Sequence, residues 1–186
     1  MRWSEAREKL AGIENLFHPS QARVLFELVR RLPDGERILE IGAWKGYSTC
    51  ALALGCTGTF KRITTIDTFA GIQENTNVQA DVSYLNEFSR NVESVGLEDY
   101  VTVLVGRSEY FYQTWNELLG LLFIDGDHRL MRDDLEAFFP HLKHGGYLAM
   151  HDIYKSDRGN LANLWGHTRE LSRLHHTYNM VWGMKL

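Results

Sequence analysis

The chain has 186 residues, a length that suits one domain with a hydrophobic core of its own. Hydrophobic residues make up 44% of the sequence and charged residues 24%, which is the ordinary balance of a globular protein. The net charge of −4 disfavours a nucleic acid as the partner, because proteins that bind phosphate backbones usually carry an excess of basic residues.

The first residues and the cysteines are typical of a cytoplasmic protein. Residues 1–17 are charged and amphipathic, without the apolar core of a signal peptide, and no segment has the ~18 apolar residues of a membrane span. Cys50 and Cys56 have no His or Cys nearby at metal-ligand spacing, so we expect two reduced thiols. We therefore expect a cytoplasmic protein with no membrane contact.

Short apolar runs alternate with longer helical patterns, which predicts a parallel sheet with helices on both faces. Residues 1–19 are expected to form a helical extension and residues 20–186 a single α/β domain. Helices are predicted at 20–32, 47–54, 81–95, 108–118, 130–142 and 160–174, with Ser20 and Ser108 as N-caps. Strands are predicted at 37–42, 62–67, 100–106, 121–125 and 147–153, and a final strand or hairpin at 175–186.

Two segments leave their roles open. The polar stretch 68–80 is long enough to be a lid or an acceptor-binding loop, although an ordinary exposed loop fits it nearly as well. The N-terminal helix, around residues 3–17, is amphipathic and could cover a pocket or join two copies of the chain. A homo-oligomer is therefore compatible with the sequence.

A turn containing two glycines follows the first predicted strand, in the run EIGAWKGYS at residues 40–48. Ligands of α/β sheets bind at such carboxyl ends of strands, and Gly42 and Gly46 let the backbone turn tightly close to a ligand. The spacing is G-x-x-x-G rather than the G-x-G-x-x-G of a dinucleotide site. Glu40 also suits a cationic or zwitterionic ligand better than a pyrophosphate, although a purely structural turn is the alternative for this motif alone.

An acidic residue, Asp67, ends the second predicted strand in the run ITTIDTF. A carboxylate at this place can accept both hydroxyl groups of a ribose. A solvated Asp at a strand end is the alternative for this residue alone. Together with the glycine turn, Asp67 predicts a ligand that contains adenosine.

Titratable side chains follow the fourth and fifth predicted strands: Asp125, Asp127 and His128 after the fourth, and His151 and Asp152 after the fifth. Because parallel strands end at one edge of a sheet, these groups can converge on one pocket. The carboxylates are ligands suited to Mg²⁺, whereas His151 would favour Mn²⁺, Fe²⁺, Co²⁺ or Zn²⁺. A polar pocket without a metal is the alternative.

Other acidic residues nearby have simpler interpretations. Asp133 and Asp134 are expected to form a solvated first turn of the next helix, where the helix dipole favours negative charge. Asp127 could instead cap that helix, and His128 could hydrogen-bond to a loop carbonyl.

These motifs together resemble a known family. The runs LEIGAWKGYST, TTIDTFAG, FIDGDH and DDLEAFFPHLKHGGYLAMHDI, with a closing LW...EL and a terminal strand, are similar to class I methyltransferases. The similarity is to the cephalosporin-hydroxylase-like and sugar O-methyltransferase branch, akin to the catechol O-methyltransferase type. It covers about residues 20–186 and implies a doubly wound, mostly parallel, seven-stranded Rossmann-like sheet that binds S-adenosylmethionine (SAM).

The resemblance also implies roles for the matching residues. The turn from Gly42 to Gly46 would face the methionine part of SAM, Asp67 the ribose and Ser108 the edge of the adenine. A divalent metal, Mg²⁺ or another, would be held by Asp125, His151 and Asp152, with Asp127 as general base beside His128. The cofactor-binding set expected from the motifs and the resemblance is Glu40, Gly42, Ala43, Gly46, Ser48, Asp67, Thr68, Ser108 and Asp125.

The expected activity is transfer of a methyl group from SAM to a hydroxyl of a small molecule, assisted by the metal if one binds. Two other functions stay open: a nicotinamide-dependent oxidoreductase on a similar sheet, disfavoured by the glycine spacing, and a non-catalytic cofactor-binding protein. A hydrolytic metalloenzyme is less favoured, because the sequence lacks a His-rich ligand set. The sequence does not specify the methyl acceptor.

Overall fold

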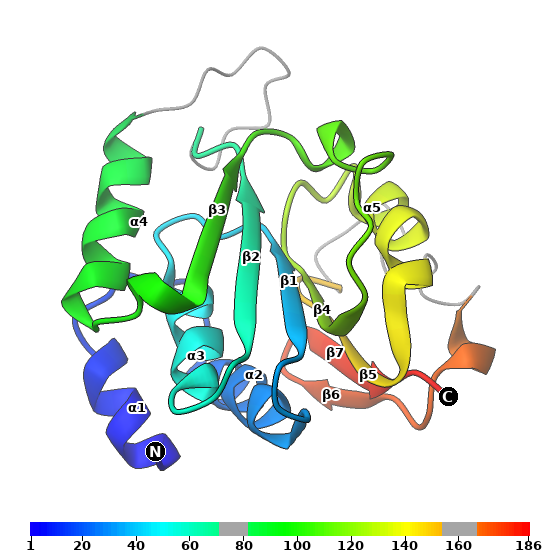
Figure 1. Cartoon of the computed structure of the whole chain (residues 1–186), viewed down its shortest axis with the longest axis horizontal. Helices are drawn as coiled ribbons and strands as arrows, with labels where there is room; N and C mark the ends of the chain where they lie inside the picture. The colour runs from blue at the N-terminus through cyan, green and yellow to red at the C-terminus, as the bar shows by residue number, and fades with distance from the viewer. Residues whose placement is uncertain (71–81, 154–166) are drawn as a thin grey trace.

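The computed structural model describes residues 1–70, 82–153 and 167–186. These residues form a seven-stranded sheet in the order β3-β2-β1-β4-β5-β7-β6 (Figure 1). Strands β1 to β5 run parallel, β7 runs antiparallel to β5, and β6 antiparallel to β7. The predicted doubly wound, mostly parallel sheet is confirmed. The strands are β1 (Arg37–Ile41), β2 (Arg62–Asp67), β3 (Val101–Val105), β4 (Leu119–Ile124), β5 (Leu142–Met150), β6 (His175–Thr177) and β7 (Met180–Met184).

Helices cover both faces of this sheet (Figure 1). Side chains of four helices share one hydrophobic core, and those of α5 (Met131–Phe138) belong to a second core on the other face. Both faces of the parallel strands are therefore buried, as such sheets require. The four helices of the first core are α1 (Trp3–Leu10), α2 (Pro19–Arg31), α3 (Tyr47–Cys56) and α4 (Val82–Ser94).

The central strand β1 divides its side chains between the two cores. Ile38 packs in the core that contains α2 and α3, whereas Leu39 and Ile41 pack in the core that contains α5. Since successive side chains of a strand point to opposite faces, Glu40 points to the face that carries α3. This alternation places the carboxyl group of Glu40, a predicted ligand-binding residue, next to α3.

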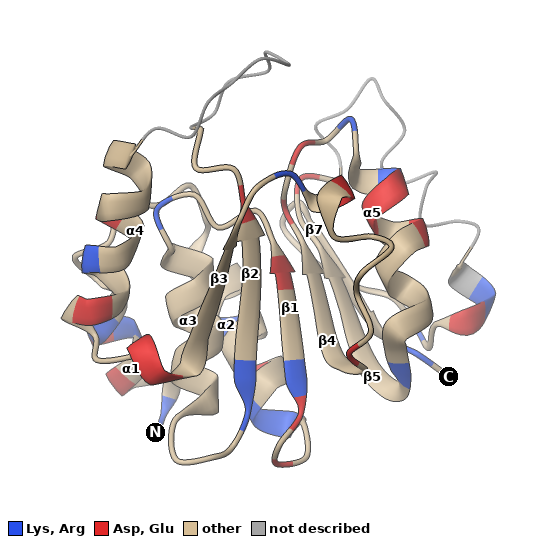
Figure 2. Cartoon of the chain, turned by 45° about the horizontal axis from the view of Figure 1, so that its top comes forward, with Lys and Arg blue, Asp and Glu red and all other residues tan. Residues whose placement is uncertain are grey.

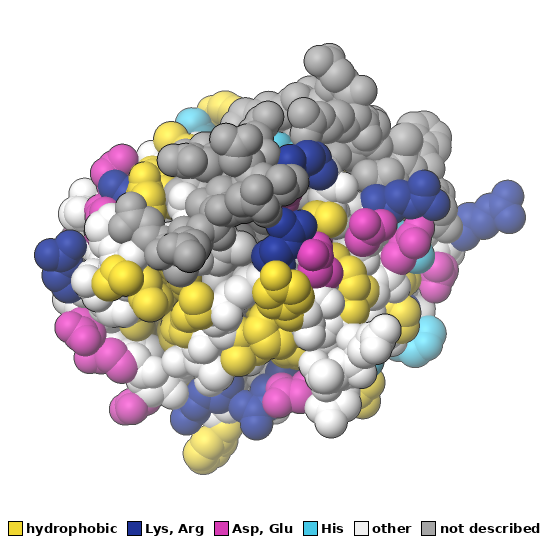
Figure 3. All heavy atoms as spheres, turned by 90° about the horizontal axis from the view of Figure 1, so that it is seen from above, with side chains coloured by type: hydrophobic (Ala, Val, Ile, Leu, Met, Phe, Trp, Pro, Cys, Tyr) yellow, Lys and Arg dark blue, Asp and Glu magenta, His cyan; other side chains and the backbone are white. Residues whose placement is uncertain are grey.

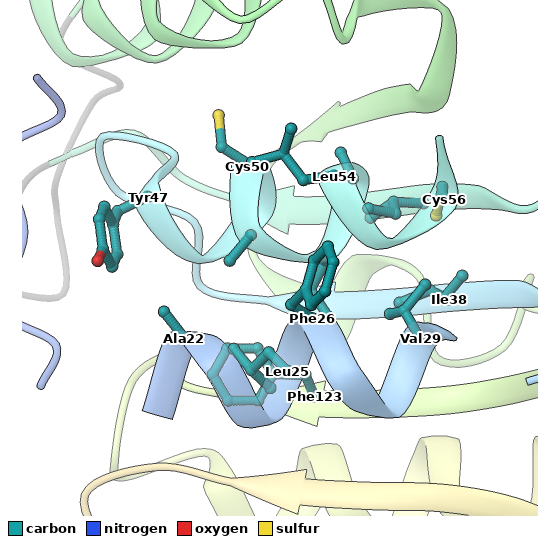
Figure 4. Packing of buried hydrophobic residues seen from close by; sticks show 14 of the residues in the cluster. Ala22, Leu25, Phe26, Val29, Ile38, Tyr47, Cys50, Leu54, Cys56 and Phe123 are labelled. Carbon is teal, nitrogen blue, oxygen red and sulfur yellow. The ribbon is translucent and has the colours of Figure 1, made fainter. Parts of the chain in front are cut away.

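Helices α2 and α3 pack closely over β1 and β4 (Figure 4). Leu25 and Val29 of α2 are fully buried against this layer, as are Leu54 and Cys56 of α3. The close approach depends on Gly55, since a Cβ atom there would lie 2.8 Å from Cβ of Val29.

The sequence predicts a helix over residues 108–118, and this prediction is wrong. Only Ser108–Tyr110 forms a single 3₁₀ turn. Farther along, the rings of Tyr112 and Trp115 meet the ring of Phe138 edge-on, with centroids 5.4 and 5.7 Å apart. Packing of these aromatic side chains against α5 outweighs the weak helical pattern of the segment.

Other boundaries differ from prediction for local reasons. His18, not Ser20, is the N-cap of α2, and its ring nitrogen accepts from the backbone N–H of Ser20. The predicted helix 130–142 ends as α5 at Phe138, because Pro140 has no N–H to continue it. Strand β5 starts at Leu142, five residues before the predicted start of the strand 147–153.

Two predicted segments fall partly outside the described residues. Of the loop 68–80, only residues 68–70 are described. Of the predicted helix 160–174, residues 167–174 are described, and they contain a 3₁₀ turn at Thr168–Glu170 but no α-helix, so the prediction is wrong there. The predicted N-terminal helix ends at Leu10, and the terminal hairpin is confirmed.

The two cysteines are free, buried thiols, and burial raises the pKa of each to about 12. Both thiols are therefore protonated at neutral pH and unreactive. Among the helices of the described residues, none combines the length and the apolar character needed to cross a membrane.

Replacing Gly55 by Ala is expected to lower the free energy of unfolding by roughly 1–3 kcal/mol, because the added methyl group overpacks the contact with Val29. Gly12→Ala is the matched control, since nothing lies within 4 Å of the position that its methyl group would take. Urea unfolding of both variants measures the effect. Equal stability of the two variants would show that α2 and α3 can move apart at little cost.

Candidate functional site

The candidate site lies at the edge of the sheet where the parallel strands end. Figure 2 shows acidic residues at this edge and basic residues at the opposite ends of β1 and β2. Sheet-like backbone hydrogen bonds continue past the strands: Gly42 donates to Ile66 O, and Asp125 donates to Ile41 O. His151 likewise donates to Ile124 O at 3.0 Å. The residues after β1, β4 and β5 are thereby held side by side.

Both glycines of the turn after β1 are required by their surroundings. Gly42 has φ +89°, and a Cβ atom there would lie 2.3 Å from the carbonyl oxygen of Asp125. Gly46 has φ +86° as the N-cap of α3, and its Cβ would lie 2.9 Å from the ring of Phe88. The turn and the segment after β4 are therefore in direct backbone contact, which only glycine allows.

Glu40 is fully buried under this turn. Its carboxyl group accepts hydrogen bonds from Ser48 Oγ at 2.6 Å and from Thr49 Oγ1 at 2.5 Å. Burial raises the pKa of Glu40 to about 7, against the lowering effect of these hydrogen bonds. The predicted ligand-binding residues Glu40 and Ser48 thus bind each other, and Thr49, which the sequence analysis missed, completes the group.

Asp67 holds the glycine turn through its carboxylate. Oδ2 accepts from the backbone N–H groups of Ala43 and Trp44 at 2.6 and 2.7 Å, and Oδ1 accepts from that of Phe69 at 2.6 Å. Asp67 is only partly buried, so the carboxylate also has access to a ligand. Next to it, the Thr68 hydroxyl accepts from the N–H of Ala70 at 3.3 Å.

The side chains after β4 and β5 meet as predicted. Nδ1 of His151 lies 2.9 Å from Oδ1 of Asp125, and Nε2 of His128 lies 3.4 Å from Oδ2 of Asp152. Burial raises the pKa of Asp125 above its usual range, while the hydrogen bond with His151 opposes this rise. Two carboxylates and two imidazoles therefore form one cluster.

Three members of this cluster lie close enough together that they could hold a metal ion. One ligand atom each of Asp125, His128 and Asp152 lies within 4.8 Å of the others. Two carboxylates with one imidazole suit a divalent cation. The predicted ligands Asp125 and Asp152 belong to this group together with His128. The predicted ligand His151 lies beside them, with Nδ1 2.9 Å from Oδ1 of Asp125 and 3.6 Å from Oδ1 of Asp152.

Asp127 is engaged by a neighbour on the same loop. Figure 3 shows basic side chains directly beside acidic ones on the face seen from above. Nη2 of Arg129 lies 2.5 Å from Oδ2 of Asp127, and its Nε lies 2.9 Å from Oδ1. These bonds hold the pKa of Asp127 below its usual range, so its carboxylate is a weak base at neutral pH. The geometry thus weakens the prediction of Asp127 as the general base.

Ser108 belongs to a separate buried group. Asp134 is fully buried, accepts from Tyr112 Oη at 2.7 Å and also hydrogen-bonds with Ser108. The prediction of a solvated Asp134 is wrong, whereas Asp133 is exposed as expected. Burial raises the pKa of Asp134 to about 6.

Two residues that the sequence analysis missed contact the cluster from distant parts of the chain. The ring of Phe17 stacks on that of His151 at 4.4 Å, and the amide of Asn179 donates to Oδ1 of Asp152. Phe17 precedes α2, and Asn179 lies in the turn between β6 and β7. No local motif marks either residue, because only the folded chain brings them to the strand ends.

Comparisons with known proteins identify a family and a shared fold. One family model, described as a methyltransferase domain, matches residues 39–153. Comparison with curated protein sequences found no match. A solved structure of a cofactor-bound protein from MTB is similar at 19% identity and a TM-score of 0.73, over 98% of this chain and 88% of that one.

Two further solved structures share the fold. One is the O-methyltransferase from Bacillus cereus in complex with SAH, with 20% identity, a TM-score of 0.68, and coverage of 98% of this chain and 90% of that one. The other is the O-methyltransferase TomG from Streptomyces achromogenes, involved in tomaymycin synthesis, in complex with SAM. It has 16% identity and a TM-score of 0.71, over 98% of this chain and 87% of that one.

The raised pKa of Glu40 predicts a pH dependence of stability. The unfolded chain loses this proton near the ordinary value of 4.5, but the folded chain keeps it until about pH 7. Stability therefore falls as the pH rises between these values, by about 3 kcal/mol for a shift of this size. The variant Glu40→Gln cannot ionise at this position, so its stability should not show this fall with rising pH.

Urea unfolding at pH 5 and pH 8 measures the difference between the wild type and the variant. Glu93→Gln, at an exposed position of α4, is the matched control and should behave as the wild type. If Glu40→Gln loses as much stability between the two pH values as the wild type, the buried carboxyl of Glu40 does not cause the pH dependence of stability.

Proposed function

The chain belongs to the methyltransferase domain family, and we propose that it transfers the methyl group of SAM to a hydroxyl oxygen of a small molecule. The resemblance seen in the sequence is confirmed at the level of the family. One observation carries the finer proposal: the matched region, residues 39–153, contains the glycine turn, Asp67 and the ends of β4 and β5, which converge at one edge.

SAM is the methyl donor that this edge suits. Two structures of the same fold were solved with SAM or SAH, and both are named O-methyltransferases. In our proposal the turn from Gly42 to Gly46 faces the methionine part, and the Asp67 carboxylate accepts from the ribose hydroxyls. In the same proposal Ala43 and Thr68 lie next to the bound SAM, and the buried hydrogen bond between Ser48 and Glu40 supports the turn.

The cluster after β4 and β5 suits a divalent cation, with Asp125, His128 and Asp152 as its ligands. When bound, a divalent cation supplies Lewis acidity that orients an acceptor hydroxyl and lowers its pKa. His151 then has a supporting role: its Nδ1 holds Oδ1 of Asp125 at 2.9 Å and so directs the other oxygen of that carboxylate.

The transfer itself requires little of the chain beyond positioning. The acceptor oxygen forms a bond to the methyl carbon while the bond from that carbon to sulfur breaks, and the hydroxyl proton leaves to water. Holding donor and acceptor at attack distance can supply about 7–11 kcal/mol of the barrier. We assign Asp127 no part as base, because Arg129 keeps its pKa low.

Other sequence-based expectations stay predictions. The cytoplasmic location is supported by the free state of Cys50 and Cys56. Homo-oligomerisation likewise stays a prediction. The spacing of Gly42 and Gly46 supports SAM rather than a nicotinamide dinucleotide, so an oxidoreductase is the less favoured activity.

Isothermal titration calorimetry with SAM and with SAH tests the proposed cofactor. We expect both to bind the wild-type chain, and Asp67→Ala to bind them about tenfold or more weakly, because charge-assisted hydrogen bonds are lost. Asp133→Ala, at an exposed position of α5, is the matched control and should bind as the wild type. Absence of affinity for both compounds in the wild type would refute the proposed function.

Titration with Mn²⁺ tests the proposed ligand set. His128→Asn should weaken Mn²⁺ binding by about tenfold or more, whereas Asp127→Asn, which changes a carboxylate outside the group, should change it far less. Chelation by EDTA should suppress methyl transfer, and added Mg²⁺ or Mn²⁺ should restore it. Full activity after thorough chelation would assign the cluster to a metal-free polar pocket.

A further inference from the structure

Two side-chain amides join the start of α2 to Asp152, and we propose that they set the orientation of its carboxylate. In this inference Asn179 and Gln21 are positioning residues of the cation site. The inference rests on the proposed function, because it assumes that Asp152 is a ligand. It concerns the C-terminal hairpin and the N-terminal part of α2, neither of which lies in the matched region, residues 39–153.

The contacts form a continuous series from α2 to the cluster. The backbone N–H of His18 donates to Oε1 of Gln21 at 2.9 Å. Nε2 of Gln21 donates to Oδ1 of Asn179 at 2.6 Å and to the carbonyl oxygen of Thr177 at 3.3 Å. Finally, Nδ2 of Asn179 donates to Oδ1 of Asp152.

Backbone groups decide which way each amide faces. A backbone N–H can only donate and a carbonyl oxygen can only accept, so His18 and Thr177 together admit one orientation of the Gln21 amide. Its NH₂ group then requires the oxygen of Asn179 as acceptor, and the NH₂ group of Asn179 must face Asp152. Gln21 is only 1% exposed, so water does not compete for these bonds.

The series ends on one particular oxygen of Asp152. Asn179 donates to Oδ1, which also lies 3.6 Å from Nδ1 of His151, while Oδ2 lies 3.4 Å from Nε2 of His128. The backbone of Asn179 adds a second contact, because its carbonyl oxygen accepts from the N–H of Ile153 at 3.1 Å. Asp152 and the residue after it are thus both held by Asn179.

The backbone around this contact is in unusual conformations. Asp152 has φ +54°, and Tyr178, beside Asn179, has φ +56°. Residues other than glycine remain in this region only where their surroundings hold them. The ring of Tyr178 stacks on that of His18 at 3.7 Å, so the same two segments that exchange the amide bonds also pack together.

The other carboxylate of the ligand group is supported in a parallel way. Nδ1 of His151 holds Oδ1 of Asp125, and the ring of Phe17 stacks on His151. Phe17 lies just before α2 and Gln21 lies in its first turn, so one short segment of the chain supports both carboxylates. Ligands held in this manner need not reorganise when a cation binds, which favours affinity.

Titration of the full-length chain with Mn²⁺, followed by electron paramagnetic resonance, tests the inference. We expect Asn179→Ala to weaken Mn²⁺ binding by about 10- to 100-fold, the usual effect of removing a group that orients a ligand. Gln21→Met, which keeps the length of a buried side chain, should weaken it less, because Asn179 can still donate. Asn15→Ala is the matched control, since it removes an exposed amide with one hydrogen bond to Ile13 O.

The double variant separates positioning from a general structural role. If Gln21 acts only through Asn179, adding Gln21→Met to Asn179→Ala should cause no further loss of Mn²⁺ affinity. Independent structural effects would instead add. The affinity for SAH, measured on the same proteins, should stay at the wild-type value, because the amides do not contact the glycine turn or Asp67.

The outcomes are distinct. Wild-type Mn²⁺ affinity in Asn179→Ala, additive losses in the double variant, or an equal loss of SAH affinity would each overturn the inference. If Asn179→Ala does not fold, wild-type Mn²⁺ affinity in Gln21→Met would overturn it instead. A wild-type chain that binds SAH but no Mn²⁺ refutes the cation site and this inference, while SAM-dependent methyl transfer stands. A chain that binds neither refutes the proposed function itself.

Discussion

The backbone hydrogen bonds that continue past the ends of the parallel strands bring together the residues that follow β1, β4 and β5. Asp125 donates to Ile41 O and His151 donates to Ile124 O, so the residues after β4 and β5 remain in the register of the sheet for one more position. Gly42 must then lack a side chain, because the carbonyl of Asp125 occupies the space of its Cβ atom. The glycine turn and the cluster after β4 and β5 become neighbours through this backbone contact.

Buried carboxyl groups in this protein are stabilised by donors from other elements. Glu40 of β1 receives hydroxyl groups from α3, and Asp134 of α5 receives the hydroxyl of Tyr112 from the segment after β3. Asp125 is paired with His151 from the segment after β5. Because an unpaired buried carboxylate is costly, each pair also ties together two elements of the fold. The polar interior therefore specifies how helices and strand ends meet as well as which chemistry the site can perform.

Neighbours in the sequence acquire different roles through their partners. Asp127 and His128 are adjacent, yet the carboxylate of Asp127 is bound by Arg129 while His128 faces Asp152. His151 and Asp152 also differ, since Nδ1 of His151 hydrogen-bonds with Asp125, whereas Asp152 belongs to the group that could hold a metal ion. Residue type and spacing alone could not separate these pairs, because the partner of each side chain comes from another part of the fold. The parts of the chain outside the matched region then complete the arrangement through Phe17, Gln21 and Asn179.

The sequence by itself determined the alternation of strands and helices, the parallel sheet, the glycine turn and the acidic residues at the strand ends. These features are local, because periodicity, glycine and strand-end position are written in consecutive residues. Only the tertiary structure decided that Glu40 faces α3, that residues 108–118 pack against α5 instead of forming a helix, and that Asp134 is buried. It also decided that His128 lies with Asp125 and Asp152 in a group that could hold a metal ion. Each of these depends on contacts between residues far apart in the chain, and no local pattern encodes the partner that a side chain meets after folding.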